Sequence, residues 1–326
     1  MKVIGRYISI LALVAIFIAL PIVFARYFLE TARITSLEQG EPNYLSHETP
    51  SDDEEIINKR LTTVLAKNFQ NIEEIPRIFL TRLPESLPEI KNTAKRKQLF
   101  ISTMLPLILR SNELIMADRK TVLKLQGKIN RGYLLRARER NWLHSLLKKY
   151  LSKIEYAQIA VQPNAEDIDL LLYKFDTIPT SLALAQAAIE SGWGRSYFSQ
   201  EGNALFGQWV WDENEAGIIP RGREEGKIHR VKSFEYLLDS VRSYMTNLNR
   251  NSNYPNLRER RAELKKHNLP VTGIALAPSL LKYSEQGPLY VSKIITMINY
   301  NGFDALDNAS LISQNQFSTN TLIATN

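Results

Sequence analysis

The pattern of apolar and polar positions divides the chain into an uncharged start, a polar stretch, a long region of helical spacing and a polar end. Residues 7–25 are uncharged and lie between the cations Lys2 and Arg6 on one side and Arg26 on the other. Such a run is typical of a signal peptide, and it approaches the roughly 20 apolar residues that span a bilayer. We therefore expect residues 1–30 to be a signal peptide or a retained membrane anchor.

The chain after this run predicts a linker followed by helices. Residues 31–55 lack apolar periodicity, are punctuated by Gly, Pro and Ser, and end in an acidic run, which is typical of a linker. Between residues 56 and 160, apolar residues recur three and four positions apart, which predicts a helical accessory region. One longer helix is expected on either side of Arg119, after short helices and turns punctuated by four prolines, Pro76, Pro84, Pro88 and Pro106. Residues 309–326 are uncharged and rich in Ser, Thr, Asn and Gln, which predicts a disordered tail.

Composition limits the chemistry that the chain can perform. With 326 residues and 44% hydrophobic content, it can bury one sizeable core and a helical annex. It has no cysteine, which excludes disulfides, thiolate metal sites and a cysteine nucleophile. Its four histidines are scattered without a close pair, which argues against zinc. We expect no metal and no cofactor, so the chemistry must depend on carboxylates, hydroxyls or lysines.

The net charge of +7 indicates an anionic partner, for which nucleic acid, acidic lipid headgroups and an anionic cell-wall polymer all qualify. Many of the cations lie in residues 91–153, where they interleave with apolar residues of helical spacing. This interleaving favours solvated helix faces over a dedicated polyanion site. No helix-turn-helix, zinc-finger or aromatic RNA-binding signature accompanies them, so we expect no nucleic acid partner.

One short helix is predicted to end on an acid. Residues 179–181, Pro-Thr-Ser, open it with a hydroxyl cap ahead of a run rich in alanine and leucine. Glu190 stands at its far end, and Gly192 and Gly194 end the helix immediately afterwards. The negative end of the helix dipole disfavours a carboxylate there, and burial among apolar residues disfavours it further.

Both effects raise the pKa of Glu190, and a carboxylic acid that is protonated near neutral pH is what cleavage of an acetal requires. The leaving sugar oxygen must collect a proton as its bond breaks. The alternative is a capping or salt-bridged surface glutamate, paired for example with Arg195, whose charge would lower the pKa. Position alone leaves both interpretations open.

Two motifs around this helix resemble a known family. The runs AQAAIESGWGRSYF (Ala185–Phe198) and GNALFGQW (Gly202–Trp209) resemble the signature of glycoside hydrolase family 73, the endo-β-N-acetylglucosaminidases of bacterial cell walls. The similarity extends over residues 178–303, and IPRIFLTRLP (Ile75–Pro84) resembles the accessory region of the Bax-type proteins of proteobacteria. The resemblance implies a mainly α (α+β) fold, in which residues 161–308 form a lysozyme-like glucosaminidase domain with a small β-rich lobe.

The resemblance also implies an activity. We expect a periplasmic enzyme that hydrolyses the β-1,4 glycosidic bonds of N-acetylglucosamine in peptidoglycan glycan strands, with Glu190 as general acid, and that reaches the inner membrane through its N-terminal segment. A muramidase or lytic transglycosylase remains an alternative, since either could act with Glu190 as its only carboxylate. A non-catalytic peptidoglycan-binding protein is a third possibility.

The family further implies a second catalytic carboxylate in the β-lobe, for which Glu224 and Glu225 are the candidates. The alternative is that these two acids only balance nearby cations, because the stretch departs from the family pattern. Tyr283, in KYSEQGPLY (Lys282–Tyr290), resembles the tyrosine of the family's YATDP-type motif, which lines the catalytic cleft. The residues that follow it differ from that motif, so a buried core tyrosine is the alternative, and Glu285 is another candidate acid.

Aromatic side chains near these acids are candidates for sugar subsites, because sugar rings pack their C–H faces on aromatic rings. Trp193 lies next to the acid in sequence. The resemblance places equivalents of Phe206 and Tyr244 near the cleft. Asn203 is also a candidate for substrate contact, although we expect it to shape a turn.

Overall fold

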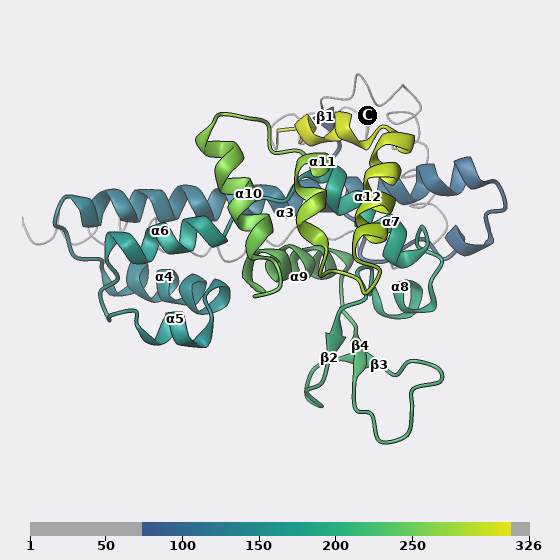
Figure 1. Ribbon diagram of the computed structural model, residues 1–326, viewed down its shortest axis with the longest axis horizontal. Coiled ribbons are helices and arrows are strands. Elements are labelled where there is room, and N and C mark those ends of the chain that lie inside the picture. The colour runs from purple at the N-terminus through teal and green to yellow at the C-terminus, as the bar shows by residue number, and fades with distance from the viewer. Residues whose placement is uncertain (1–73, 314–326) are drawn as a thin grey trace, which may run out of the picture. The chain divides into compact units, whose positions relative to one another are not determined.

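A computed structural model describes residues 74–313 of the chain. The predicted anchor (residues 1–30) and linker (residues 31–55) lie outside the described residues. The described part is built mainly of helices, with one small antiparallel sheet projecting below them (Figure 1). The predicted mainly α fold with a small β-lobe is therefore confirmed.

Helix α3 spans Thr93–Asn130 and passes through the centre of this helical body (Figure 1). It begins at Asn92, whose side chain accepts a hydrogen bond from the backbone of Lys95. The longer helix predicted around Arg119 is confirmed, but Pro106 lies inside it and does not divide it, contrary to the sequence prediction. A proline inside a helix costs about 3 kcal/mol, and the unbroken run of buried residues on both sides of Pro106, residues 99–109, offsets that cost.

By length and composition α3 could cross a membrane, with a mean hydropathy of 1.3, yet 72% of its apolar window is buried inside the protein. It packs against α6 (Ala165–Lys174), α7 (Thr180–Ser191) and α9 (Leu237–Arg250). Its apolarity is therefore explained by its place in the core. The described residues on both sides of the predicted boundary at residue 160 belong to one compact unit.

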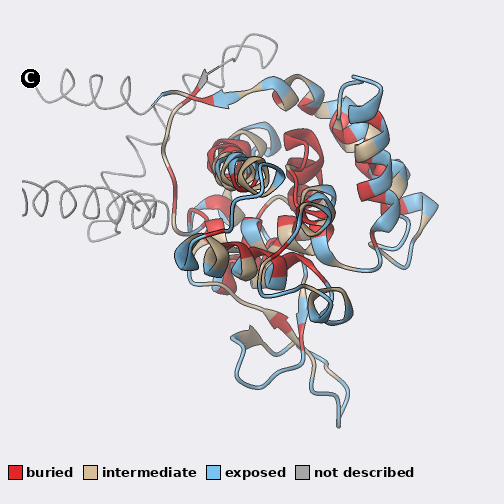
Figure 2. Ribbon diagram, turned by 90° about the vertical axis from the view of Figure 1, so that its left-hand side faces the viewer, coloured by how far each residue is buried: buried red, intermediate tan, exposed pale blue. Residues whose placement is uncertain are grey.

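Further helices surround this centre. They are α4 (Ala137–Tyr150), α5 (Lys153–Ala157), α8 (Tyr197–Gly202), α10 (Pro255–Lys266), α11 (Gly273–Leu276) and α12 (Pro288–Asn301), with 3₁₀ turns η2 (Leu87–Glu89), η3 (Ala277–Leu280) and η4 (Phe303–Asn308). Buried residues concentrate where the helices meet, and exposed residues dominate the loops of the β-lobe (Figure 2). The basic stretch mostly covers solvated helix faces, as predicted, with these residues exposed: Lys95, Arg131, Arg136, Arg138, Lys148 and Lys149.

The β-lobe is a three-stranded antiparallel sheet. Strand β4 (Arg230–Lys232) lies in the middle, between β2 (Trp209–Val210) and β3 (Gly217–Ile218). Val210 and Val231 are buried within it. The lobe connects α8 to α9, so it lies next to the segment that follows the Glu190 helix.

A second, two-stranded sheet joins the beginning and end of the described chain. Strand β1 (Glu74–Ile75) pairs in parallel with β5 (Ser310–Leu311), and Leu311 is buried. The backbone of Ile312 donates a hydrogen bond to the carbonyl of Ile75. The predicted disordered tail, residues 309–326, therefore starts too early, because its first apolar residues complete this pair of strands.

A buried ion network around Asp176 links α3 to α10. Arg119 of α3 and Lys265 of α10 both form ion pairs with the Asp176 carboxylate, which is 4% exposed. Arg261 of α10 is 1% exposed and donates to the side-chain oxygen of Asn249 and to the carbonyl of Lys174. Burial alone would raise the pKa of Asp176, but Arg261, Arg119 and Lys265 together hold it below its usual range.

Candidate active site

Helix α7 carries Glu190 in its last turn. The helix ends, as predicted, at Gly192, which adopts the left-handed conformation with φ 58°. Its start differs from the predicted hydroxyl cap: the backbone and hydroxyl of Ser181 both donate to the carboxylate of Asp307, each at 2.8 Å. The capping oxygen thus comes from a residue distant in sequence, which local pattern cannot reveal.

The Glu190 carboxyl is half-buried, and the hydroxyl of Tyr290 donates to its Oε1 at 2.6 Å. Burial disfavours the charged form and raises the pKa of Glu190, although the hydrogen bond from Tyr290 acts in the opposite direction. The pKa shift therefore has the direction that the sequence predicted, with burial as its main cause. Arg195 is exposed, and residues 74–313 contain no ion pair between it and Glu190.

A directed chain of hydrogen bonds leads to Oε1. The hydroxyl of Tyr244 donates to Oε1 of Gln186 at 2.6 Å, and Nε2 of Gln186 donates to the hydroxyl of Tyr290 at 3.0 Å. Because the Tyr290 oxygen accepts from the amide, its own proton is directed at Glu190. Oε1 is thus an acceptor, and the acidic proton of Glu190 is left to Oε2.

Stacked aromatic rings hold this chain in place. The rings of Tyr283 and Tyr290 stack with centroids 5.4 Å apart, and Tyr254 lies 5.9 Å from Tyr283. Phe206 stacks on Tyr244 at 4.0 Å. Burial raises the pKa of Tyr244, Tyr283 and Tyr290 above the usual value, so these phenols act as neutral hydrogen-bond donors.

The predicted site residues Tyr283, Phe206 and Tyr244 therefore belong to the Glu190 group. Tyr283 is half-buried, and its hydroxyl donates to the carbonyl of Phe206 at 3.3 Å. Phe206 and Tyr244 are only 3% and 0% exposed, so they lie beneath the site and support it. The prediction that they contact sugar is corrected, because a buried ring has no free face for a substrate.

Two other predicted contacts lie elsewhere. The ring of Trp193 makes a T-shaped contact with Phe100 at 5.7 Å, and the ammonium of Lys97 covers one of its faces at 4.6 Å, so the ring is partly buried against α3. Asn203 is buried with φ 52°, and its amide donates to the carbonyls of Phe234 and Glu235. The structure thus gives Trp193 a packing role and Asn203 the expected turn-shaping role.

No second acid contacts Glu190 in the part of the chain that the structure describes. Glu224 and Glu225 are exposed in the connection between β3 and β4, and Glu285 is exposed before α12. None of the three forms a hydrogen bond or ion pair with the Glu190 group. Their catalytic role stays a prediction, and for Glu224 and Glu225 it requires the β3–β4 connection to approach the carboxyl.

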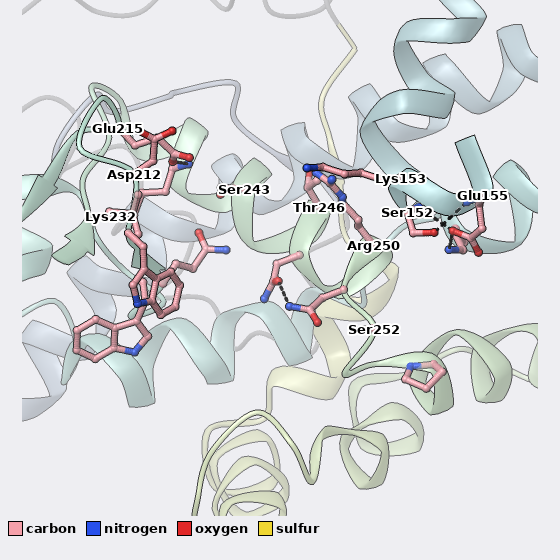
Figure 3. A pocket seen from close by; sticks show the side chains of 18 of the residues that line it. Ser152, Lys153, Glu155, Asp212, Glu215, Lys232, Ser243, Thr246, Arg250 and Ser252 are labelled. Carbon is pink, nitrogen blue, oxygen red and sulfur yellow. Dashed lines mark hydrogen bonds and ion pairs between the residues drawn. The ribbon is translucent and has the colours of Figure 1, made fainter. Parts of the chain in front are cut away.

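The chain after α8 passes close to the free oxygen of Glu190. Gly207 has φ 60°, and a Cβ built on it would lie 3.8 Å from Oε2. Next to it, Gln208 lines a groove of about 940 Å³ that runs between the β-lobe and the helices α5 and α9 (Figure 3). A volume of this size accommodates more than one sugar ring. Glu190 is not among the residues that line this groove, and the link between them is Gly207, which lies near Oε2 and is followed in the chain by Gln208.

Sequence analysis missed two members of the hydrogen-bonded chain, Gln186 and Tyr290. Gln186 precedes Glu190 by four residues in a helix, which places both on one face, and it is a polar residue in an otherwise apolar run. That combination is a usable signal. Tyr290 carries no such mark, because it reaches Glu190 only through the packing of α12 on α7.

Comparisons with known proteins give the family. A profile of the Glucosaminidase family, described as mannosyl-glycoprotein endo-beta-N-acetylglucosaminidase, matches residues 168–303. "Protein bax" of Escherichia coli (strain K12) is 31% identical over 224 residues, which are 66% of this chain and 74% of that protein. The chain belongs to the Bax-type glucosaminidase-like family. No solved structure gives a significant match.

Family membership gives the chain a domain of the glycosidase type. The matched residues begin inside α6 and include all members of the Glu190 group. Helices α3, α4 and α5 precede the match, although α3 packs directly on α7. Among residues 74–313, no group of three or more His, Asp or Glu side chains is arranged to hold a metal ion.

Proposed function

We propose that this protein hydrolyses the β-1,4 glycosidic bonds of N-acetylglucosamine in peptidoglycan, with Glu190 as the general acid. The observation that carries this proposal is the half-buried Glu190 carboxyl, whose pKa is raised by burial and whose Oε1 is occupied by the Tyr290 hydroxyl. The family match to a glucosaminidase supports the substrate class. The proposed location is the periplasm, reached through the N-terminal segment.

In the proposed mechanism, Oε2 of Glu190 gives its proton to the leaving sugar oxygen as the glycosidic bond breaks. The chain from Tyr244 through Gln186 and Tyr290 keeps Oε1 as an acceptor, so the proton stays on the oxygen beside Gly207. After proton transfer, the same hydrogen bond from Tyr290 stabilises the new carboxylate. Burial thus favours the protonated acid before transfer, and the hydrogen bond from Tyr290 favours its anion afterwards.

The sugar carbon must also be attacked as the bond to the leaving oxygen breaks, and Glu224 or Glu225 is proposed to assist. With about 6.5–9.5 Å between the two carboxyls, the second carboxylate would activate the attacking water and the configuration would invert. With about 5–5.5 Å, it would bond to the carbon itself, and water activated by Glu190 would then release the sugar with retention. Either geometry requires the exposed β3–β4 connection to close over the groove.

Analysis of the ends produced on purified peptidoglycan tests the proposal. New N-acetylglucosamine reducing ends are the expected product, detected by borohydride reduction and mass spectrometry of the fragments. Anhydromuramyl ends would instead assign a lytic transglycosylase, and reducing muramic acid would assign a muramidase. Binding without any cleavage would make the protein a non-catalytic wall binder.

Replacing Tyr290 with phenylalanine tests the orientation of the acid. The ring stays, but Oε1 of Glu190 loses its hydrogen bond. In the wild type this bond lowers the pKa of the carboxyl, so its loss raises that pKa. We expect kcat to fall about 10-fold, and the pH at which kcat/KM declines on the alkaline side to move upward. Tyr283→Phe is the matched control, because its hydroxyl bonds the Phe206 carbonyl and not Glu190. An alkaline limb that stays in place in Tyr290→Phe would contradict the proposed role.

A further inference from the structure

The groove lined by Gln208 has two unlike walls. On the β-lobe side lie Trp209 and Trp211, which are 49% and 60% exposed, together with the ion pair between Lys232 and Glu215. On the opposite side lie residues of α5 and the end of α9, including Lys153 and Arg250 (Figure 3). The first wall, called the tryptophan wall, thus offers flat aromatic surface. The second, called the positive wall, offers the charges of Lys153 and Arg250.

The positive wall contains cations that no acid neutralises. Within residues 74–313, Lys153 and Arg250 take part in no ion pair or hydrogen bond, and both are exposed. Lys174, which also lines the groove, is paired with Glu155 at 2.6 Å. Two uncompensated charges on one wall of a groove raise the local concentration of anions and favour an anionic ligand group.

The chain segments that carry Arg250 and Lys153 are held in place by buried contacts. The guanidinium of Arg258, which is 4% exposed, donates to the carbonyls of Leu248 and Asn251 and so fixes the end of α9 where Arg250 lies. The Lys174–Glu155 pair joins α6 to α5, which begins with Lys153. The positive wall is therefore a fixed part of the groove.

We propose that this wall binds the carboxylates of the peptide stems that branch from a peptidoglycan strand, while the sugars lie along the tryptophan wall. The proposal rests on the proposed function, because Gln208 in the groove lining follows Gly207, whose position lies near Oε2 of Glu190. Lys153 precedes the residues matched by the family profile, so the accessory helices supply part of the recognition. The substrate is thus wall material that still carries its stems, in preference to bare glycan.

Binding measured without turnover tests this inference independently of catalysis. Full-length chains with Glu190→Gln are titrated calorimetrically with soluble glucosaminyl-muramyl tetrasaccharides, either bearing peptide stems or stripped of them by an amidase. The double variant Lys153→Ala/Arg250→Ala is expected to weaken binding of the stem-bearing fragment about 3- to 10-fold. Its binding of the stripped fragment stays unchanged, and added salt reduces the difference between fragments.

The matched control is Lys124→Ala/Arg131→Ala, which removes the same charge from two exposed cations outside the groove. It is expected to bind both fragments as the parent chain does. Equal affinity of the parent for both fragments, or equal loss in the groove and control variants, would overturn stem recognition. Failure of the proposed function would show separately, as an absence of cleaved products in chains that keep Glu190.

Discussion

Replacing Glu190 with glutamine is expected to reduce kcat on purified peptidoglycan by about 100- to 10 000-fold. The amide keeps the shape of the side chain but has no acidic proton for the leaving sugar oxygen. Stability should not fall, because burial raises the pKa of Glu190 and so makes its charged form unfavourable in the folded protein. The measurements are release of reducing ends and the Tm of both proteins at neutral pH.

The pH dependence gives the same test a second readout. A general acid works in its protonated form, so wild-type activity declines as pH rises through the pKa of Glu190. Because that pKa is raised, the decline lies at higher pH than for an ordinary glutamate. In Glu190→Gln the residual rate should not show this decline at high pH. Glu201→Gln, a change at an exposed acid on α8, should behave as wild type; substantial activity in Glu190→Gln would remove the acid role.

The elements that sequence predicted well are those set by local chemistry. The end of α7 at Gly192 requires a left-handed residue, and the acid just before it follows from the same short motif. The direction of the Glu190 pKa shift also follows, since an acid in an alanine-rich core helix is desolvated. Each of these depends on residues within one or two helical turns.

What sequence missed depends on packing between distant segments. The chain from Tyr244 to Tyr290 joins α9, α7 and α12, and each link needs the tertiary arrangement first. Trp193 lies in the family-like motif beside Glu190, yet its ring packs against Phe100 and Lys97 of α3. The aromatic residue closest to the acid in sequence is thus used to attach the accessory helix.

The same dependence on distant segments explains the errors in the fold predicted from sequence. Pro106 was expected to interrupt a helix, because local geometry disfavours it there, but burial of the surrounding residues in the core outweighs that preference. Ser310 and Leu311 have the composition of a tail, and only the parallel partner strand β1, more than two hundred residues away, gives them structure. Local pattern predicts elements, whereas long-range burial decides these exceptions.

Replacing Asp176 with asparagine is expected to lower the free energy of unfolding by about 3–5 kcal/mol, because Arg261 would be left buried without a compensating charge. Urea denaturation followed by circular dichroism measures this loss. Asp304→Asn, at an exposed acid on η4, is the control, expected to change stability by less than about 0.5 kcal/mol.

The pH dependence of the stability difference between wild type and Asp176→Asn follows from the depressed pKa of Asp176. A carboxylate whose folded pKa lies below its unfolded value of about 3.9 contributes its full stabilisation above that value. The contribution is lost as pH falls through the folded pKa. The stability difference between wild type and Asp176→Asn should therefore be constant near neutral pH and shrink in acid; a difference that persists unchanged in acid would contradict the ion network as its source.

The position of Asp176 makes this result informative about the domain as a whole. Arg119 belongs to α3, before the family-matched residues, whereas Lys265 and Arg261 belong to α10 within them. Asp176 itself lies just before α7, the helix that carries Glu190. If Asp176→Asn unfolds the protein in one transition that also abolishes activity, the accessory helix and the catalytic helix form one cooperative unit. The raised pKa of Glu190 then depends on α3, because burial by the whole unit is the main cause of that shift.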